Sequence, residues 1–310
     1  MSDFDVVVIG GGTAGLSAAL VLSRARRNVL VVDSGAPRNA PAAHMHGFLS
    51  RDGLPPGELL ALGRDEVTGY GGIVLDGAVT QLAHDDTPGF RVLLADGQRF
   101  SARRLLVTTG LRDELPDIPG LRDRWARDVL HCPYCHGHEV RDQQLGVLGG
   151  SHEAVRYAQI IRQWSSDVVF FTPERALTAD ERSQLGARAI GIVEGTVTRV
   201  LIEDDKLCGV EMDDGRRVPR AALFVPPRFV PNNDVLVGLG CDIDETGWVV
   251  TDSGGRTSVP GVWVAGNVAN PRAQVITAAG EGSAAAIAIN ADLVDQDVRN
   301  AVHDFNEEYQ

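Results

Sequence analysis

Two cysteines with two residues between them form the part of this 310-residue sequence with the most evident chemistry. They lie in the segment His131-Cys132-Pro133-Tyr134-Cys135-His136, and at this spacing two thiols can close a small disulfide ring and reopen it. A thiol at a turn or helix start has a lowered pKa, so one cysteine can attack a disulfide while the other resolves it. The adjacent imidazole, with an ordinary pKa of about 6.5, can hold or deliver the proton that this exchange moves. The segment predicts a redox centre with Cys132, Cys135 and His136 as catalytic residues.

Zinc binding is the competing interpretation of this segment. The potential ligands are His131, Cys132, Cys135, His136 and His138. A closed structural zinc site usually has two separated pairs of ligands. The remaining cysteines, Cys208 and Cys241, are isolated and typical of small buried hydrophobic residues. We therefore expect redox chemistry and no metal, with zinc binding and inert packing as the alternatives.

A glycine-rich turn near the N-terminus is the second chemical feature. Gly10, Gly12 and Gly15 lie between an apolar run and a helical stretch, and Asp33 ends the next apolar run. The first glycine allows a tight turn, the second lets backbone N–H groups approach a pyrophosphate, and the third lets helix and strand close up. The helix N-terminus favours the phosphates, and the acid can bind a ribose hydroxyl. The turn predicts a dinucleotide site, with a glycine turn kept only for packing as the alternative.

Two β-α-β units are expected to position these residues. The first has a strand at 4–9, a helix at 14–26 and a strand at 29–32, and the second has a strand at 145–148, a helix at 154–164 and a strand at 168–171. Such units require right-handed crossovers and a parallel sheet that is covered on both faces. The sequence thus predicts an α/β fold with two Rossmann-like, three-layer (ββα) domains of the nucleotide-binding type.

The proposed domain limits follow from two proline-rich segments. Residues 116–120 have the composition of an interdomain hinge, and residues 226–231 mark the return of the chain towards the first domain. We expect residues 1–115 and 241–310 to form a discontinuous first domain and residues 116–240 to form a central domain that carries the cysteine pair. A prior of about 150 residues per domain also favours two domains.

Composition restricts the partners. The formal net charge is −13 and no block of Lys or Arg occurs, which argues against nucleic acid and anionic membranes and favours a small molecule or a protein. No apolar run approaches the roughly 18 residues of a membrane span. The N-terminus also lacks the basic segment and cleavage site of a secretory signal peptide. We expect a cytoplasmic protein, where a closely spaced cysteine pair is more often catalytic or metal-binding than structural.

The order of these pieces resembles the low-molecular-weight thioredoxin reductase family of flavoproteins over essentially the whole chain. Besides the glycine turn and the cysteine pair, the resemblance is carried by Thr109-Gly110, by Ala265-Gly266-Asn267 and by residues 274–280. It implies a homodimer with FAD in the discontinuous domain. The implied FAD-binding residues are Gly10, Gly12, Thr13, Ala14, Gly15, Asp33, Ser34, Arg38, His46, Val79, Thr109, Gly110, Gly266, Asn267, Gln274 and Val275. Asn267 replaces an aspartate of the family, but an amide can still hydrogen-bond a ribityl hydroxyl.

The second β-α-β unit departs from the NADPH-binding pattern of that family. The family has Gly-x-Gly-x-x-Ala, whereas this chain has Ser151 at the second glycine and Glu153 at the start of the helix. A carboxylate there disfavours a phosphate by up to about 1 kcal/mol. The basic cluster for the 2′-phosphate is reduced to Arg175, next to Glu174. Tight NADPH binding is therefore not expected, while weak NADH binding stays open.

A cysteine pair combined with a degraded nucleotide site resembles the dithiol oxidases of disulfide natural products, of the holomycin and gliotoxin type. The resemblance implies that a small-molecule dithiol is oxidised to an intramolecular disulfide and that O2 is reduced to H2O2. It also implies that Cys132 exchanges with substrate, that Cys135 faces the flavin, and that His136, at a position where reductases usually have an acid, is the acid/base. The alternatives are a ferredoxin- or NAD(P)H-dependent disulfide reductase like thioredoxin reductase, and a non-catalytic FAD-binding redox sensor.

Overall fold

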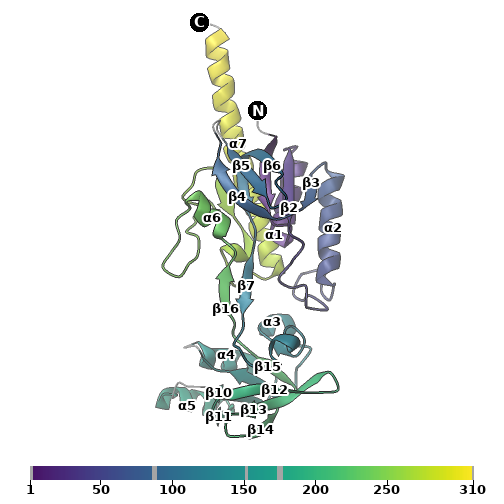
Figure 1. Ribbon diagram of the computed structural model, residues 1–310, viewed down its shortest axis with the longest axis vertical. Coiled ribbons are helices and arrows are strands. Elements are labelled where there is room, and N and C mark those ends of the chain that lie inside the picture. The colour runs from purple at the N-terminus through teal and green to yellow at the C-terminus, as the bar shows by residue number, and fades with distance from the viewer. Residues whose placement is uncertain (1–2, 86–88, 151–152, 173–176, 309–310) are drawn as a thin grey trace.

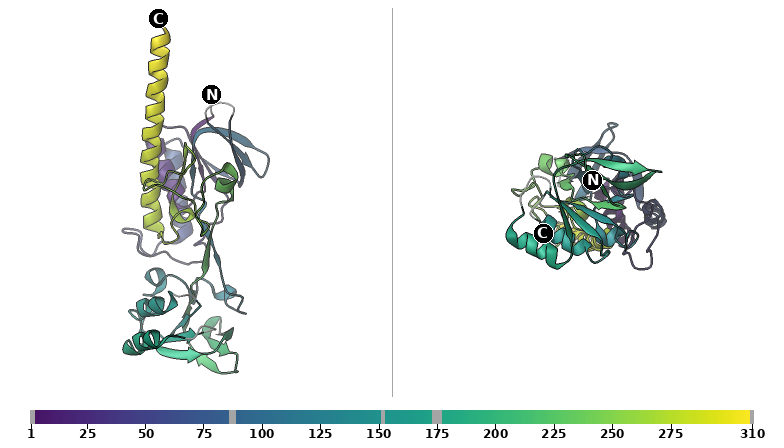
Figure 2. Two further views of the ribbon diagram at one scale, coloured as in Figure 1. Left: turned by 90° about the vertical axis from the view of Figure 1, so that its left-hand side faces the viewer. Right: turned by 90° about the horizontal axis from the view of Figure 1, so that it is seen from below.

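The computed structural model describes residues 3–85, 89–150, 153–172 and 177–308. Figure 1 shows two lobes stacked along the long axis and joined by a narrow two-stranded ribbon, with both chain ends on the first lobe. The side view in Figure 2 shows the C-terminal helix lying against that lobe and projecting beyond it.

A seven-stranded sheet forms the first lobe, in the order β3-β2-β1-β6-β5-β4 with β17 beside β6. Its strands are β1 (Phe4–Ile9), β2 (Val29–Asp33), β3 (Ile73–Asp76), β4 (Val79–His84), β5 (Phe90–Leu94), β6 (Arg99–Val107) and β17 (Val262–Val264). β1 pairs in parallel with β2 and β6, whereas β4, β5 and β6 pair antiparallel. Val6, Val7 and Val8 are fully buried because apolar layers cover both faces of the sheet.

The longer helices of the first lobe are α1 (Thr13–Arg24), α2 (Pro56–Gly69) and α7 (Val275–Glu308). The backbones of α1 and α7 are in close contact at Gly282. A Cβ at this position would lie only 2.0 Å from the carbonyl oxygen of Ala14, so only glycine allows this approach. α7 is longer than a typical globular helix because neither Gly nor Pro follows Gly282. In the described ranges, no helix is both long and apolar enough to cross a membrane.

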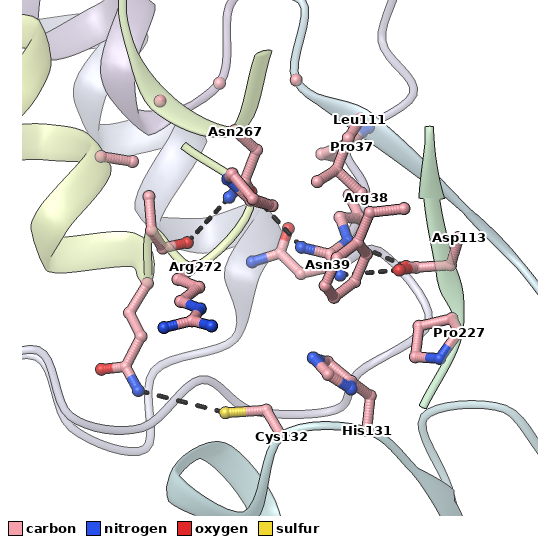
Figure 3. A pocket seen from close by; sticks show the side chains of 18 of the residues that line it. Pro37, Arg38, Asn39, Leu111, Asp113, His131, Cys132, Pro227, Asn267 and Arg272 are labelled. Carbon is pink, nitrogen blue, oxygen red and sulfur yellow. Dashed lines mark hydrogen bonds and ion pairs between the residues drawn. The ribbon is translucent and has the colours of Figure 1, made fainter. Parts of the chain in front are cut away.

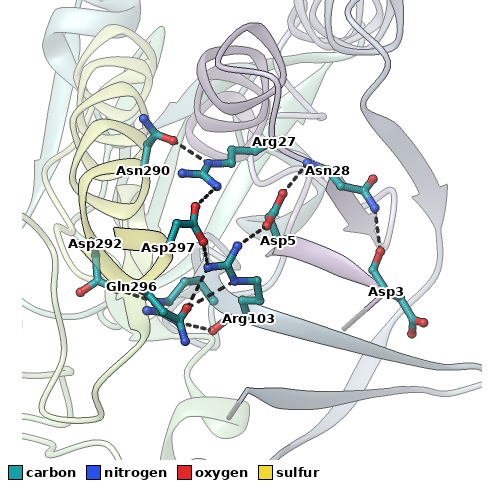
Figure 4. Close-up of polar contacts among 10 residues, drawn as sticks. Asp3, Asp5, Arg27, Asn28, Arg103, Asn290, Asp292, Gln296 and Asp297 are labelled. Atoms are coloured by element: carbon teal, nitrogen blue, oxygen red, sulfur yellow. Dashed lines mark hydrogen bonds and ion pairs between the residues drawn. The ribbon is translucent and has the colours of Figure 1, made fainter. Parts of the chain in front are cut away.

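Ion pairs tie the middle of α7 to the sheet, as Figure 4 shows. Arg27 after α1 contacts Asp297 at 2.9 Å, and Arg103 of β6 contacts both Asp297 and Asp5, the latter at 2.8 Å. Desolvation by burial lowers the pKa of Arg103, but the hydrogen bonds to Asp297 and Asp5 outweigh it and raise the pKa above its usual value, so Arg103 stays charged. The contacts fix α7, whose first turn reaches the site described below.

The second lobe has a parallel five-stranded sheet, in the order β11-β10-β9-β15-β8. The strands are β8 (Val129–Leu130), β9 (Leu145–Leu148), β10 (Val168–Thr172), β11 (Gly191–Glu194) and β15 (Ala222–Phe224). The helices α4 (Ala154–Ile161) and α5 (Ala179–Ala187) and an antiparallel sheet of β12 (Val197–Glu203), β13 (Lys206–Met212) and β14 (Arg217–Pro219) accompany it. Both lobes therefore confirm the predicted α/β class with Rossmann-like sheets.

The ribbon between the lobes consists of β7 (Leu111–Glu114) and β16 (Arg228–Pro231), paired antiparallel. The remaining short elements are η1 (Arg122–Arg124), α3 (Pro133–His136), α6 (Asp234–Leu239) and η2 (Gly266–Val268). Leu236 and Leu239 of α6 are buried in the core of the first lobe. We therefore propose that the chain returns to the first domain after residue 231, rather than at the expected residue 241.

Candidate active site

The single turn of α3 holds the cysteine pair. Cys132 and Cys135 form a disulfide. Cys132 caps the turn, and its Sγ accepts a hydrogen bond from the backbone N–H of Cys135 at 3.1 Å. Pro133 suits the first helical position because its missing N–H would have no partner there. A Cβ on Gly137 would lie 2.4 Å from the carbonyl oxygen of Pro133, so only glycine fits the end of this turn.

A cavity of about 1750 Å³ lies between the lobes and contains the disulfide. Of the predicted residues, its lining includes Gly10, Gly12, Thr13, Ala14, Asp33, Ser34, Arg38, Val79, Thr109, Gly110, Cys132, Cys135, His136, Gly266, Asn267, Gln274 and Val275. Gly15 does not line the cavity, because it packs beneath the turn. His46 does not line it either, because its side chain lies in a second, adjacent cavity. The fold thus joins the N-terminal glycine turn and the central cysteine pair in one space.

The glycine turn presents the N-terminus of α1 to the cavity. Gly10 has a φ of +107°, and a Cβ on Gly15 would lie 2.0 Å from its carbonyl oxygen. A Cβ on Gly12 would meet nothing within 4 Å. Gly12 is the N-cap residue of α1 and has no side chain that could cap the helix. The first residues of α1 line the cavity, so their backbone N–H groups are not covered by a capping side chain. These residues therefore fit the pyrophosphate of FAD, as the Gly-x-Gly-x-x-Gly spacing predicts.

Asp33 orients the same turn. One carboxylate oxygen accepts the backbone N–H of Gly11 at 3.0 Å, and the other pairs with Arg64 of α2. Arg64 also contacts Asp76 at 2.9 Å. The sequence prediction missed Arg64, because no spacing links residue 64 to the turn. Asp33 still lines the cavity, where we propose that it binds the ribose of FAD.

Arg38 lies on the cavity and pairs with Asp113 of the ribbon, as Figure 3 shows. Its guanidinium donates to both carboxylate oxygens of Asp113 at 2.7 and 2.8 Å and lies 5.1 Å from the ring centroid of Phe229. It also approaches the amide oxygen of Asn267 at 3.5 Å, while the amide nitrogen of Asn267 donates to two backbone carbonyls. A bidentate pair of this kind is rigid. Arg38 therefore helps to fix the orientation of the Asn267 amide, whose oxygen keeps a second lone pair for a further donor.

Two further contacts lie at the cavity wall, and the first of them reaches the disulfide. The Gln274 amide, just before α7, lies 4.0 Å from the Sγ of Cys132. The Thr109 hydroxyl donates to the carbonyl oxygen of Asn232 at 2.6 Å, and the Asn232 amide donates back to Thr109 at 3.0 Å. The sequence prediction missed Asn232, as it missed Asp113 and Phe229, because no local pattern marks them.

A second cavity of about 510 Å³ adjoins the first at His136, which lines both. In this cavity His46 lies between Asp52, at 3.3 Å from its Nδ1, and Glu139, at 3.5 Å from its Nε2. Burial lowers the pKa of His136, Glu139 opposes this shift, and His46 adds to it. His136 is therefore neutral at pH 7 and can accept a proton. The side chain of His46 thus lines the second cavity together with His136.

The second β-α-β unit is described only in part. Ser151, Glu174 and Arg175 lie outside the described residues. Glu153 caps α4 without a side-chain hydrogen bond and lines the main cavity. A carboxylate thus stands where the family binds a phosphate. No three His, Cys, Asp or Glu side chains group as metal ligands in the part of the chain that is described.

Comparisons with known proteins agree with this geometry. The sequence pattern of the pyridine nucleotide-disulphide oxidoreductase family matches residues 4–282. The crystal structure of HlmI is 55% identical, with a TM-score of 0.96 over 99% of this chain and 98% of that one. A thioredoxin reductase structure, TrxB from Bacillus anthracis, is 33% identical with a TM-score of 0.90 over 94% of this chain and 99% of that one. Thioredoxin reductase sirT of Leptosphaeria maculans is 29% identical over 96% of both chains.

These likenesses confirm the resemblance inferred from the cysteine pair and the glycine turn, and they confirm FAD as the cofactor. The family match covers more than half of the chain, and the solved structures share both lobes. The chain belongs to the pyridine nucleotide-disulphide oxidoreductase family and is a thioredoxin reductase-like, flavin-dependent thiol/disulfide oxidoreductase.

Proposed function

We propose that this enzyme is a dithiol oxidase, which forms an intramolecular disulfide in a small-molecule natural-product dithiol and passes the electrons to O2 as H2O2. The observation that carries the proposal is the cavity shared by the disulfide and the FAD-binding turn, with neutral His136 beside the disulfide. The Glu153 carboxylate on the same cavity disfavours a nicotinamide dinucleotide as the electron donor. The chain is more similar to HlmI, at 55% identity, than to the thioredoxin reductase TrxB, at 33%.

The proposed reaction balances as two successive thiol–disulfide exchanges. One substrate thiol, deprotonated by His136, attacks Cys132, and the Cys135 thiolate leaves and takes the proton. The second substrate thiol then displaces Cys132, which releases the product disulfide and leaves both enzyme cysteines reduced. The residues of the glycine turn would hold FAD, which would supply two-electron transfer from this enzyme dithiol to O2. The Cys132–Cys135 disulfide would re-form, and the two thiol protons would go to H2O2. Cys135 is proposed to face the flavin.

The electron donor tests this function. Mixed anaerobically with the holoenzyme, dithiothreitol should bleach the flavin at least about a hundredfold faster than NADPH or NADH, because about two charge-assisted phosphate contacts are missing. Stopped-flow absorbance measures both rates, and air should then restore the flavin with one H2O2 per dithiol. Fast bleaching by NADPH would favour the reductase alternative. Disulfide reduction by reduced ferredoxin, without peroxide from dithiols, would favour the ferredoxin-dependent one.

The pH dependence should report His136. Its pKa is lowered, so the neutral, proton-accepting form persists below pH 6.5, and flavin reduction by dithiothreitol should fall only as the pH drops through that lowered value. Glu139 raises this pKa, so Glu139→Gln should move the acid limb to still lower pH and leave the alkaline plateau unchanged. Glu203→Gln, an exposed acid on β12, is the matched control. An acid limb that stays in place, or moves to higher pH, would contradict this role of His136.

The proposal also includes a homodimer in the reducing cytoplasm. A reducing compartment keeps a free dithiol substrate in its thiol form, so its oxidation to a disulfide there requires a dedicated enzyme. Sedimentation of the holoenzyme would test the dimer.

A further inference from the structure

His131, directly before Cys132, lines the main cavity and has no part in the mechanism above. Its ring centroid lies 5.1 Å from that of Phe229 on β16, edge to face, and 6.3 Å from that of Tyr157 on α4, stacked. The Tyr157 hydroxyl donates to the backbone carbonyl of His131. Figure 3 shows the ring between Cys132 and Pro227. The imidazole is therefore held in one orientation by the ribbon and by the second lobe.

The hydrogen bonding of this ring is incomplete. Nδ1 of His131 is buried and has no partner among the described residues. Since the residue nevertheless lines the cavity and Nδ1 is covered, Nε2 is the nitrogen on the cavity side. A buried polar atom without a partner is rare, and a buried N–H without an acceptor is rarer than a bare acceptor. The ring proton therefore belongs on Nε2.

The charge state supports a fixed donor. Burial, together with the positive charge of Arg38 and the neighbouring His136, lowers the pKa of His131 to about 4, and Asp113 opposes this only in part. The imidazole is thus neutral at pH 7, with one N–H and one bare nitrogen. It does not exchange protons there, which leaves the acid/base role to His136.

We propose that His131 is a substrate-binding residue whose Nε2–H donates a hydrogen bond to a carbonyl oxygen of the small dithiol bound at Cys132–Cys135. This inference rests on the proposed function and refines its substrate class. The enzyme should prefer a dithiol with an amide or similar carbonyl close to its sulfur atoms over a dithiol without one. The aromatic rings on both sides of His131 would pack against the body of such a molecule.

The test compares two dithiols and two variants of the holoenzyme. The probes are N-acetyl-cysteinyl-cysteine amide, which has amide carbonyls next to its thiols, and dithiothreitol, which has none. His131→Phe keeps the ring contacts and removes the N–H, whereas His131→Gln keeps a donor. For the dipeptide, His131→Phe should raise KM about tenfold with kcat unchanged, as expected for one net hydrogen bond, and His131→Gln should restore most of the loss. KM for dithiothreitol should stay unchanged in both variants.

A binding measurement separates this inference from the proposed function. The cyclic disulfide of the same dipeptide, titrated calorimetrically into oxidised holoenzyme, should bind about tenfold more weakly to His131→Phe whether or not O2 is the acceptor. Equal losses for both dithiols, unchanged disulfide affinity, or no binding of this probe to the wild type would overturn the inference. A changed flavin absorption spectrum with unchanged disulfide affinity would place the donor on FAD and overturn it as well. Failure of dithiol oxidation with intact, His131-dependent binding would instead overturn the proposed function alone.

Discussion

Cys132→Ser should lower the rate of flavin reduction by dithiothreitol at least about a thousandfold, because a serine can neither form the disulfide nor act as a thiolate. The variant should still fold and bind FAD, since Sγ of Cys132 makes one hydrogen bond to the Cys135 N–H that a hydroxyl can replace. Anaerobic stopped-flow absorbance measures the reduction, and peroxide release measures the complete reaction.

Cys208→Ser is the matched control. The prediction that Cys208 is buried is wrong, because it is an exposed free cysteine on β13 away from the cavity, whereas Cys241 is buried as expected. Its rate should stay within about twofold of the wild type. Cys135→Ser distinguishes the proposed roles, since only this variant keeps a Cys132 thiolate that can attack the cyclic product disulfide. One product sulfur then leaves as a thiol, and the other stays bound to Cys132 in a mixed disulfide that mass spectrometry can detect. Unchanged dithiol oxidation in Cys132→Ser would overturn the catalytic role and favour the non-catalytic redox sensor.

The local elements of the fold could be predicted where burial is continuous. β1 and β9 occupy the expected residues, because strands covered on both faces have uninterrupted apolar runs. α4 ends at Ile161 rather than at 164, and α1 ends at Arg24 rather than at 26. Neither end has a distinctive stop signal. The lobe to which α6 belongs could not be predicted, because the burial of Leu236 and Leu239 depends on contacts with strands that are distant in the sequence.

The residues of the site likewise fall into those that a local sequence pattern identifies and those that only the tertiary fold brings together. The glycine turn and the cysteine pair are local patterns, so their residues and their chemistry could be inferred directly. Asp113, Phe229 and Asn232 reach the cavity only because β7 and β16 pair across more than a hundred residues of sequence. The resemblance alone assigns His46 to FAD, and this assignment stays a prediction, because the fold shows only that the His46 side chain lies beside Glu139.

Gly15→Ala should remove FAD from the purified protein almost completely and destabilise the first lobe by more than about 3 kcal/mol. The added Cβ would lie 2.0 Å from the carbonyl oxygen of Gly10 and 2.7 Å from the hydroxyl of Thr108, so α1 must move away from β1. The turn that presents the backbone N–H groups then loses its shape. Flavin absorbance per protein and urea unfolding of the apoprotein measure the two effects separately.

Gly12→Ala is the comparison variant for Gly15→Ala. Its Cβ would meet no protein atom within 4 Å and would point into the space proposed for the pyrophosphate. The stability of the apoprotein should therefore change by less than about 1 kcal/mol, while FAD binds more weakly. The third glycine is then required for the packing of helix on strand, and the second for the approach of the cofactor. Full FAD content in Gly15→Ala, or an equal loss of apoprotein stability in both variants, would contradict this division between the two glycines.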